Sequence, residues 1–294
     1  MNAGVDILGP ALLFCPGNRA DRFDKALQAA DQAVIDLEDS VGPNEKDTAL
    51  ANAITLVRRP DARAIVRANR PITERGRQEI AALAAAGARR ILLPKTESGA
   101  EVDAALEQGR SAPAMEFLLT VETAKGVIAL PEMLSRPRIA GISWGPYDLA
   151  ADMGLRSVRD EDGNFLSPIA HARDQLLLQA AAARLPAFDT VTTELGDPEQ
   201  IARDVTAAVT LGFLGKFAIH PSQVPIIRAA FIPAARDVER ARRMLAAAAG
   251  NAVFVFEGEM VDEPILRRAR HIVALADRIG ARGSSEPSAR RAKG

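Results

Sequence analysis

Cysteine is almost absent from this sequence, and Cys15 is the only one among its 294 residues. A chain with one cysteine cannot form an internal disulfide, and such sparse use is typical of proteins in the reducing cytoplasm. The first fifteen residues contain no basic leader and include Asp6, so we do not expect a signal peptide. These observations predict a cytoplasmic protein without structural disulfides.

An excess of either charge is also missing. The chain has 37 Lys and Arg against 38 Asp and Glu, which gives a formal net charge of -1. No overall basic field attracts nucleic acid, and no acidic block indicates a solvated tail. No apolar run approaches the roughly 18 residues that are needed to span a bilayer. We therefore expect a globular protein that binds neither nucleic acid nor a membrane.

What the sequence does contain is a series of eight short apolar or β-branched runs, separated by segments with helical spacing. Most runs lack strict alternation, as expected for strands that are covered on both faces. Helix punctuation agrees, because Asp197 and Pro198 suit the start of one helical segment and Gly212 suits its end. Eight successive β–α units predict an α/β fold of the (β/α)8 TIM-barrel type. The expected strands are Ala11–Pro16, Ala33–Asp39, Ala64–Asn69, Arg90–Lys95, Glu116–Glu122, Ile139–Gly145, Ala187–Thr193 and Lys216–Pro221.

A doubly wound open sheet is the alternative architecture. Such a sheet usually has a Gly-rich phosphate turn after its first strand, and the segment from Cys15 to Arg19 does not match one. The barrel is therefore expected to cover 1–230. The segment 231–280 reads as a C-terminal extension, with helices at 237–249 and 265–279, and it is too small to fold alone with confidence. The Ser-, Arg- and Gly-rich segment 281–294 is expected to be a disordered tail.

Two acidic residues follow neighbouring runs of the expected barrel. Glu122 ends the fifth run and Asp148 follows the sixth. A parallel α/β protein keeps its chemistry at the carboxyl ends of its strands. Two carboxylates with open positions beside them suit Mg2+, which prefers oxygen ligands and retains some of its waters. Our hypothesis is that Glu122 and Asp148 bind Mg2+ in an enzyme that makes or breaks a carbon–carbon bond.

Further charged residues stand at the ends of the second and fourth runs. Strand alternation would point Asp36 and Glu38 to one side and Asp39 to the other, so these three cannot all be metal ligands. We expect Glu38 and Asp39 to surround the site, where they hold metal-bound water or a basic side chain, or else to pair structurally. Lys95 is expected to pair with an acidic residue of the site, and a Schiff-base role is less consistent with a metal pair.

The order of several motifs resembles that of the citrate lyase beta-subunit-like CoA-ester lyases, within the HpcH/HpaI aldolase/citrate lyase superfamily. The resemblance extends from about residue 11 to residue 277, and its strength comes from the order of the motifs rather than from any single one. The motifs are Leu13-Phe14-Cys15-Pro16-Gly17-Asn18-Arg19, Val34-Ile35-Asp36-Leu37-Glu38-Asp39-Ser40-Val41, Val66-Arg67-Ala68-Asn69, Leu93-Pro94-Lys95, Val121-Glu122-Thr123, Gly145-Pro146-Tyr147-Asp148-Leu149, Gly215-Lys216-Phe217-Ala218-Ile219-His220-Pro221 and Met260-Val261-Asp262-Glu263-Pro264.

This resemblance implies a TIM-type barrel, an essential Mg2+ and cleavage or formation of a short β-hydroxyacyl-CoA such as malyl-CoA or citramalyl-CoA. The partners would be an acyl-CoA and a 2-oxo acid. The family's metal ligands fall on Glu122 and Asp148, and its substrate arginine falls on Arg67. Its catalytic acid or base falls on Asp262, which would come from a neighbouring subunit through the C-terminal extension. The resemblance thus implies a homo-oligomer, a trimer or a hexamer.

Three residues of the first motif, Phe14, Pro16 and Arg19, are expected to border the pantetheine arm of the thioester, or else to pack at the barrel rim. Other functions remain as alternatives. The chain could act as a citryl-acyl-carrier lyase subunit within a complex, as a metal-dependent aldolase of free 2-oxo acids, or as a non-catalytic barrel that binds an acidic metabolite. The aldolase branch that uses a histidine base near the second strand is disfavoured, because no histidine precedes His171.

Overall fold

The computed structural model describes residues 9–60, 62–248, 250–251 and 253–283. The chain divides into two compact units, with the boundary between residues 228 and 229. All eight strands expected from the sequence lie in the first unit. Within the described ranges, no helix is both long and apolar enough to cross a membrane.

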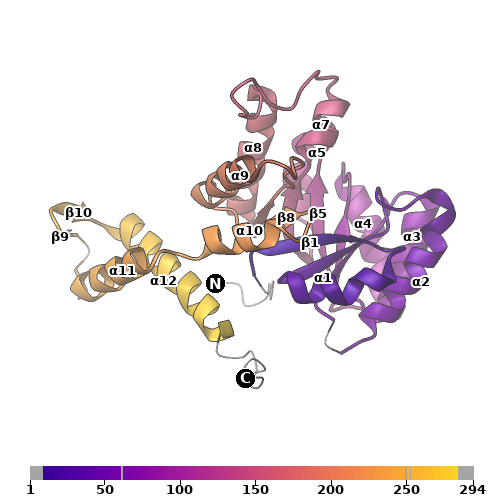
Figure 1. Ribbon diagram of the computed structural model, residues 1–294, viewed down its shortest axis with the longest axis horizontal. Helices are drawn as coiled ribbons and strands as arrows, with labels where there is room; N and C mark the ends of the chain where they lie inside the picture. The colour runs from indigo at the N-terminus through magenta and orange to yellow at the C-terminus, as the bar shows by residue number, and fades with distance from the viewer. Residues whose placement is uncertain (1–8, 61, 249, 252, 284–294) are drawn as a thin grey trace. The chain divides into compact units, whose positions relative to one another are not determined.

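The first unit is a closed barrel of eight parallel strands in sequence order, with β8 returning to pair with β1 (Figure 1). The predicted TIM-type fold is confirmed. Strand β7 is shorter than expected and ends at Asp189 rather than at Thr193. The strands are β1 (Ala11–Pro16), β2 (Gln32–Asp36), β3 (Ala64–Arg67), β4 (Arg90–Leu93), β5 (Glu116–Val121), β6 (Ile139–Trp144), β7 (Ala187–Asp189) and β8 (Gly215–Ala218).

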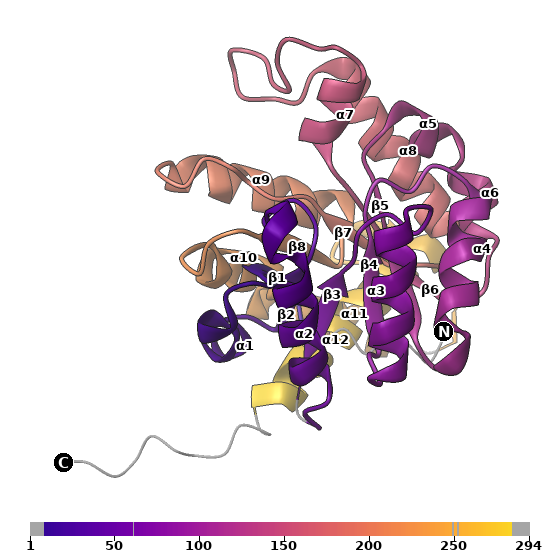
Figure 2. The same cartoon turned by 90° about the vertical axis from the view of Figure 1, so that its right-hand side faces the viewer.

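Helices lie around the outside of the barrel and cover its strands, as Figure 2 shows. Helix α9 illustrates how the sequence sets their ends. The Asp197 carboxylate caps it by accepting hydrogen bonds from the backbone N–H groups of Glu199 and Gln200, and Gly212 ends it at φ +89°. The helices are α1 (Phe23–Ala29), α2 (Lys46–Val57), α3 (Glu74–Ala85), α4 (Gly99–Gln108), α5 (Ala124–Ile128), α6 (Leu130–Leu134), α7 (Pro146–Asp152), α8 (Ser167–Ala183), α9 (Pro198–Leu211) and α10 (Gln223–Phe231).

Apolar side chains fill the interior of the barrel. Each of the eight strands contributes one buried residue to a single cluster, in which Leu12 and Phe188 are completely buried. Burial of each large side chain of this kind stabilises the fold by about 2 kcal/mol. The closed packing leaves the chemistry to the ends of the strands. The cluster contains Leu12, Val34, Ile65, Leu92, Leu118, Ala140, Phe188 and Phe217.

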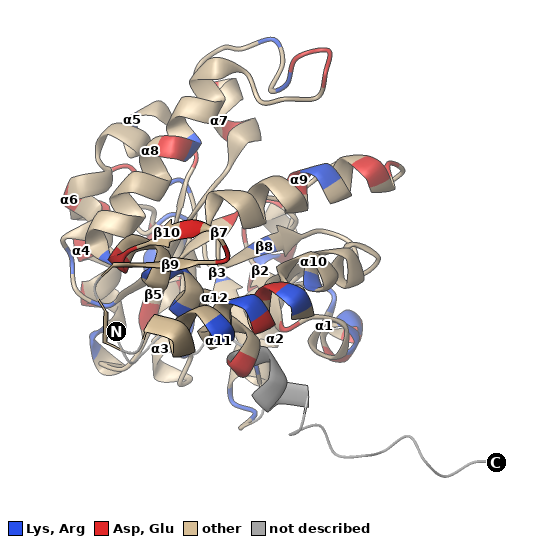
Figure 3. Cartoon of the chain, turned by 90° about the vertical axis from the view of Figure 1, so that its left-hand side faces the viewer, with Lys and Arg blue, Asp and Glu red and all other residues tan. Residues whose placement is uncertain are grey.

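The second unit contains α11 (Ala235–Ala248), a hairpin of β9 (Phe254–Phe256) and β10 (Glu259–Val261), and α12 (Glu263–Gly283). Its small core gathers Met244, Val261 and Leu266 with neighbouring apolar residues. Figure 3 shows acidic and basic residues interspersed along α11 and α12. The sequence did not predict β10. Helix α12 continues into the segment expected to be a disordered tail, and the remainder of that tail, from residue 284, lies outside the described residues.

Candidate active site

Arg67 and Asp36 form the most completely hydrogen-bonded ion pair at the strand ends. The parallel register places Asp36, at the end of β2, directly beside Arg67, at the end of β3. The guanidinium donates from Nε to Oδ1 and from Nη2 to Oδ2, each at 2.7 Å. Asp36 also accepts hydrogen bonds from the backbone N–H groups of Glu38 and Ser40. Burial alone would raise the pKa of Asp36, but Arg67 outweighs this effect and holds that pKa below its ordinary value.

Glu38 and Asp39 both approach the same cations. The Arg67 Nη1 atom lies 3.1 Å from Glu38 Oε2 and 3.9 Å from Asp39 Oδ2. Lys95 Nζ donates to Glu38 Oε1 at 2.7 Å and to Asp39 at 3.0 Å. The expectation that alternation separates Glu38 from Asp39 was wrong, because β2 ends at Asp36 and the next residues turn. Burial, partly offset by Arg67 and Lys95, raises the pKa of Glu38.

Lys95 has an unusual backbone conformation. Its φ angle is +48°, in the left-handed region that residues with a Cβ rarely adopt. In this conformation its N–H donates a hydrogen bond to Glu122 Oε1 at 2.8 Å, while its ammonium group reaches the acidic side chains of the site. Backbone strain of this kind costs on the order of 1–3 kcal/mol and is commonly found at functional sites. The strain is therefore consistent with a role for Lys95 in positioning Glu122.

Glu122 is a buried carboxyl group with little compensation. Only 4% of the residue is exposed, at the point where β5 ends. Burial, together with the nearby charges of Asp148 and Glu38, raises the pKa of Glu122 to about 8 against the opposing effect of Lys95. Gly145 makes room for this side chain, because a Cβ atom at that position would lie 2.4 Å from Glu122 Oε2.

Asp148 faces the same site from the first turn of α7. Its Oδ1 atom lies 3.5 Å from Lys95 Nζ, and its side chain is 45% exposed. Within the part of the chain that the structure describes, no three acidic, histidine or cysteine side chains are placed to hold a metal together. Glu122 and Asp148 thus offer two carboxylate groups, which suits Mg2+ because this ion commonly takes one or two protein carboxylates and keeps several waters. The donor set fits the metal predicted from the sequence.

The three residues expected at the pantetheine arm line one cavity of about 600 Å3 beside the ends of β1 and β8. Phe14 and Pro16 border it from β1, and Arg19 follows that strand. The Phe14 ring stacks on Phe217 at 5.2 Å and lies 4.8 Å below the Arg67 guanidinium. Arg19 pairs with Asp21 at the surface. The cavity therefore adjoins the Arg67 side of the site.

Asp262 lies in the second unit, between β10 and α12. Its backbone carbonyl accepts a hydrogen bond from Leu266, and its Oδ1 lies 3.5 Å from the Ile265 nitrogen in the manner of a helix N-cap.

Sequence reasoning assigned no role to the residues that support this cluster. Asp36 anchors Arg67, and Lys46 Nζ donates to the carbonyls of Leu37 and Glu38 and to Asn69. The available signal was the spacing of strand ends, because parallel pairing of β2 with β3 places Asp36 beside Arg67.

Comparison with known proteins identifies the group to which the barrel belongs. Residues 11–221 match the HpcH/HpaI aldolase/citrate lyase family. The chain belongs to this family. A citrate lyase subunit beta-like protein of Mycobacterium tuberculosis is 36% identical over 269 residues, covering 91% of this chain and 96% of that protein. The chain is accordingly a carbon–carbon lyase of the citrate lyase beta-subunit-like type, among the CoA-ester lyases.

A solved structure and a second relative add chemical detail. The crystal structure of CitE from Mycobacterium tuberculosis in complex with magnesium, acetoacetate and coenzyme A has a TM-score of 0.82 and 35% sequence identity, covering 92% of this chain and 98% of that one. A (3S)-malyl-CoA thioesterase of Cereibacter sphaeroides is 32% identical over 280 residues, covering 92% and 95%. Family members with similar sequences thus differ in the reaction for which they are named.

Proposed function

We propose that this protein is a cytoplasmic, Mg2+-dependent lyase that cleaves or forms a short β-hydroxyacyl-CoA, such as malyl-CoA or citramalyl-CoA. The products of cleavage are a 2-oxo acid and an acyl-CoA. The observation that carries this proposal is the arrangement of Glu122 and Asp148 opposite Arg67, with a fixed cation and two carboxylate groups at one end of the barrel. The solved relative that binds magnesium and coenzyme A supports the same assignment.

Glu122 and Asp148 would hold the metal. When bound, Mg2+ supplies Lewis-acid polarisation of the hydroxy-acid half of the substrate. Gly145 leaves space for the Glu122 carboxylate, and the Lys95 N–H fixes one of its oxygens. Both ligands thus come from defined positions at the end of β5 and at the start of α7.

Arg67 would stabilise the charge that develops when the carbon–carbon bond breaks. The electron pair of that bond passes to the carbon beside the thioester and is delocalised to the thioester oxygen as an enolate. The hydroxyl-bearing carbon becomes the carbonyl of the 2-oxo acid, and its hydroxyl proton passes to solvent. The guanidinium is held rigidly by Asp36, and its charge does not titrate at physiological pH. A fixed cation in a partly buried position stabilises such an oxyanion more effectively than solvent does.

Asp262 would exchange the proton with the enolate carbon, donating it in cleavage and removing it in synthesis. We assign it to the site of a second copy of this chain, in a trimer or hexamer. The hairpin beside it supports this assignment, because Val255 and Met260 are cross-strand partners and are 73% and 66% exposed. Apolar pairs that are left in solvent commonly mark protein interfaces. The domain assignment that follows is a barrel of about 1–230 and an extension of 231–280 that packs on a neighbouring subunit.

The pantetheine arm of the substrate would occupy the cavity at Phe14, Pro16 and Arg19. Lys25 and His220 line the same cavity and add polar groups for a phosphorylated ligand. Lys95, Glu38 and Asp39 would surround the metal site without binding the ion directly. Their mutual ion pairs keep the Lys95 ammonium charged. Burial lowers the pKa of Lys95, but the hydrogen bonds with Glu38 and Asp39 and the charges of Glu38 and Glu122 together outweigh it and raise that pKa.

The experiment that tests this function is incubation of the purified protein with malyl-CoA, citramalyl-CoA or citryl-CoA, followed by identification of the products by mass. We expect a 2-oxo acid and an acyl-CoA from one of these esters, with activity lost in EDTA and restored by Mg2+. Full activity without metal would overturn the assignment. Turnover of an acyl-carrier thioester alone would indicate the carrier-linked citryl lyase.

Hydrolysis is the second candidate reaction, because the relative from Cereibacter sphaeroides is a malyl-CoA thioesterase. The products identified in this assay distinguish the two reactions. Hydrolysis releases the intact hydroxy acid and free CoA, whereas carbon–carbon cleavage releases no free thiol. A thiol reagent added to the assay therefore decides between them.

A further inference from the structure

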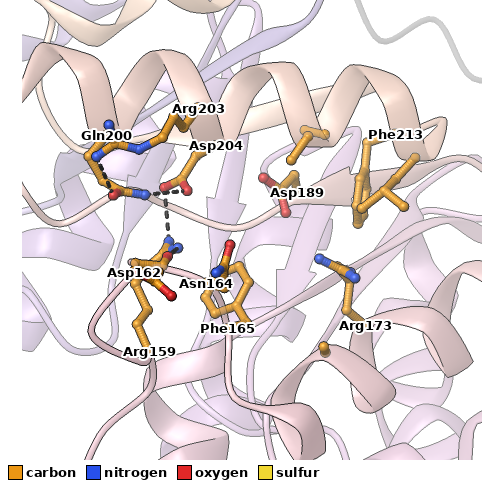
Figure 4. A pocket seen from close by; sticks show the side chains of 15 residues that line it. Arg159, Asp162, Asn164, Phe165, Arg173, Asp189, Gln200, Arg203, Asp204 and Phe213 are labelled. Carbon is orange, nitrogen blue, oxygen red and sulfur yellow. Dashed lines mark hydrogen bonds and ion pairs between the residues drawn. The ribbon is translucent and has the colours of Figure 1, made fainter.

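A second polar cavity lies outside the barrel wall, between β7, α8 and α9. Its volume is about 330 Å3, and the segment of residues 159–165 borders it (Figure 4). Asp189 forms part of its wall. Because Phe188, the preceding residue of β7, belongs to the barrel interior, strand alternation directs Asp189 outward. The cavity shares no residue with the candidate active site.

One end of this cavity is a network of buried charges. The Asp204 carboxylate accepts hydrogen bonds from Arg159 at 2.9 Å, from Thr192 at 2.7 Å and from Gln200 at 2.8 Å. Arg159 and Asp204 are 14% and 8% exposed at their side chains. Replacing such a pair with apolar residues is often neutral or stabilising, so its presence here is poorly explained by stability alone.

Asp189, a second of the three acidic residues that line the cavity, is also neutralised. Asp189 accepts hydrogen bonds from Lys216 Nζ at 2.7 Å and from Trp144 Nε1 at 2.9 Å. Asp189 and Asp204 are therefore not left as buried, uncompensated negative charges that would repel an anion. The third, Asp162, is exposed, so solvent and salt screen its charge.

Arg173 contributes positive charge at the opposite end from Arg159. Figure 4 shows its guanidinium directed toward the space beside Asp189 and Phe213. Among the described residues, its hydrogen bonds all go to the carboxylate of Asp174, an exposed neighbour, through Nε and Nη2. The Arg173 side chain is itself only 18% exposed. A half-enclosed arginine whose partner lies in solvent is suited to bind an incoming anion.

We propose that this cavity binds a small organic anion, with a carboxylate or phosphate group at Arg173 and an apolar body against Phe165 and Phe213. Its volume lies within the range of small-molecule sites, which are mostly apolar with a few convergent polar groups. The proposal is independent of the lyase reaction.

The fluorescence of Trp144 can report ligand binding at this cavity. Trp144 is the single tryptophan of the chain, and its indole contacts two groups of the cavity wall. Its Nε1 donates to Asp189, and its ring meets the edge of Phe165 at a centroid distance of 5.1 Å. An anion that perturbs Asp189 or Phe165 should therefore change the fluorescence of Trp144.

The test is a titration of the full-length protein with benzoate, phenyl phosphate and neutral benzamide, followed by Trp144 fluorescence. We expect a saturable change with at least one anion and none with benzamide, and the tighter anion shows whether carboxylate or phosphate is preferred. Arg173→Gln should raise the Kd at least tenfold, and Asn164→Asp should raise it by adding negative charge at the cavity. A surface control, Arg110→Gln, should leave it within twofold.

Glu122→Gln separates this cavity from the active site. The Kd should stay within twofold in that variant, since Glu122 does not line the cavity. A response that is lost in Glu122→Gln but kept in folded Arg173→Gln places the probe in the active site and overturns the proposal. An equal response to benzamide, or no saturable response to either anion, also overturns it.

Discussion

The two sides of the candidate active site treat a buried carboxyl group in opposite ways. Asp36, at the end of β2, is matched by a guanidinium with two hydrogen bonds, and its pKa is depressed. Glu122, at the end of β5, faces other carboxylates with only Lys95 in partial compensation, and its pKa is raised to about 8. The negative charge of Asp36 is balanced within the chain, whereas a bound cation would stabilise the ionised form of Glu122. The comparison indicates that Asp36 has a structural role, whereas Glu122 is suited to bind a cation.

Replacement of Glu122 by Gln should produce the largest effect on activity. Loss of this proposed metal ligand should reduce kcat/KM by about 10^3-fold, or about 4 kcal/mol, and abolish tight Mg2+ binding in calorimetry. Without metal, however, the variant should be as stable as the wild type or more stable, because a poorly compensated buried carboxyl group is removed.

The pH dependence of stability provides a second test of the buried Glu122 carboxyl group. Because the folded-state pKa of Glu122 is raised from 4.5 to about 8, its contribution to stability is full below pH 4.5 and is lost as the pH rises toward 8. Metal-free wild-type protein should therefore lose stability relative to Glu122→Gln across this interval, and Mg2+ should reverse the loss. Equal stability curves for the two proteins at every pH would contradict the comparison.

The same chemical change on the other side should act in the opposite direction. Asp36→Asn removes the carboxylate that pairs with Arg67 through two hydrogen bonds, and it should lower the free energy of unfolding by about 3–5 kcal/mol. Denaturant titration measures this change. The control is Asp103→Asn, which breaks an exposed pair with Arg136 and should cost less than about 1 kcal/mol. If Asp36→Asn were as harmless as the control, the distinction between the two sides would fail.

Asp262→Asn tests the proposed proton-transfer group, which belongs to the second unit. We expect a fall in kcat of about 10^2-fold, because the proposed proton-transfer group is lost while Mg2+ affinity and stability are kept. If a second copy supplies Asp262, then mixing Asp262→Asn with Glu122→Gln subunits should restore part of the activity. Mixed subunits that remain inactive after verified exchange would argue for an Asp262 that acts within its own chain.

Gly145→Ala should produce the smallest of these effects. The added Cβ would lie 2.4 Å from Glu122 Oε2, so the carboxylate must move and Mg2+ affinity should fall about tenfold. Gly196→Ala is the matched control, because its added Cβ meets nothing within 4 Å. Calorimetric titration with Mg2+ compares the two, and equal affinities would show that Glu122 needs no such space.

Much of the barrel and of this site follows from sequence patterns. The apolar runs located all eight strands, because both faces of a barrel strand are covered and the runs are bounded by polar turns. The placement of Glu122 at a strand end, and its proximity to Asp148, follow from the same rule. Local patterns suffice where a side chain's position depends only on where its strand stops.

Other features depend on contacts that no local pattern contains. Alternation was extended past Asp36, although the strand ends there and Asp39 turns back toward Lys95. The network of Arg159 with Asp204 joins residues 45 positions apart, and its cavity exists only because one segment folds against α9. Features that depend on the tertiary packing of loops therefore could not be predicted from the sequence.

The left-handed backbone of Lys95 makes this position a point of conflict between two selective pressures. Glycine or asparagine would adopt the same φ angle at a lower backbone cost. Either substitution removes the ammonium group that links Glu38, Asp39 and Asp148. A lineage that had abandoned catalysis would be free to relax this turn, so a small residue here could mark family members that have become pseudoenzymes.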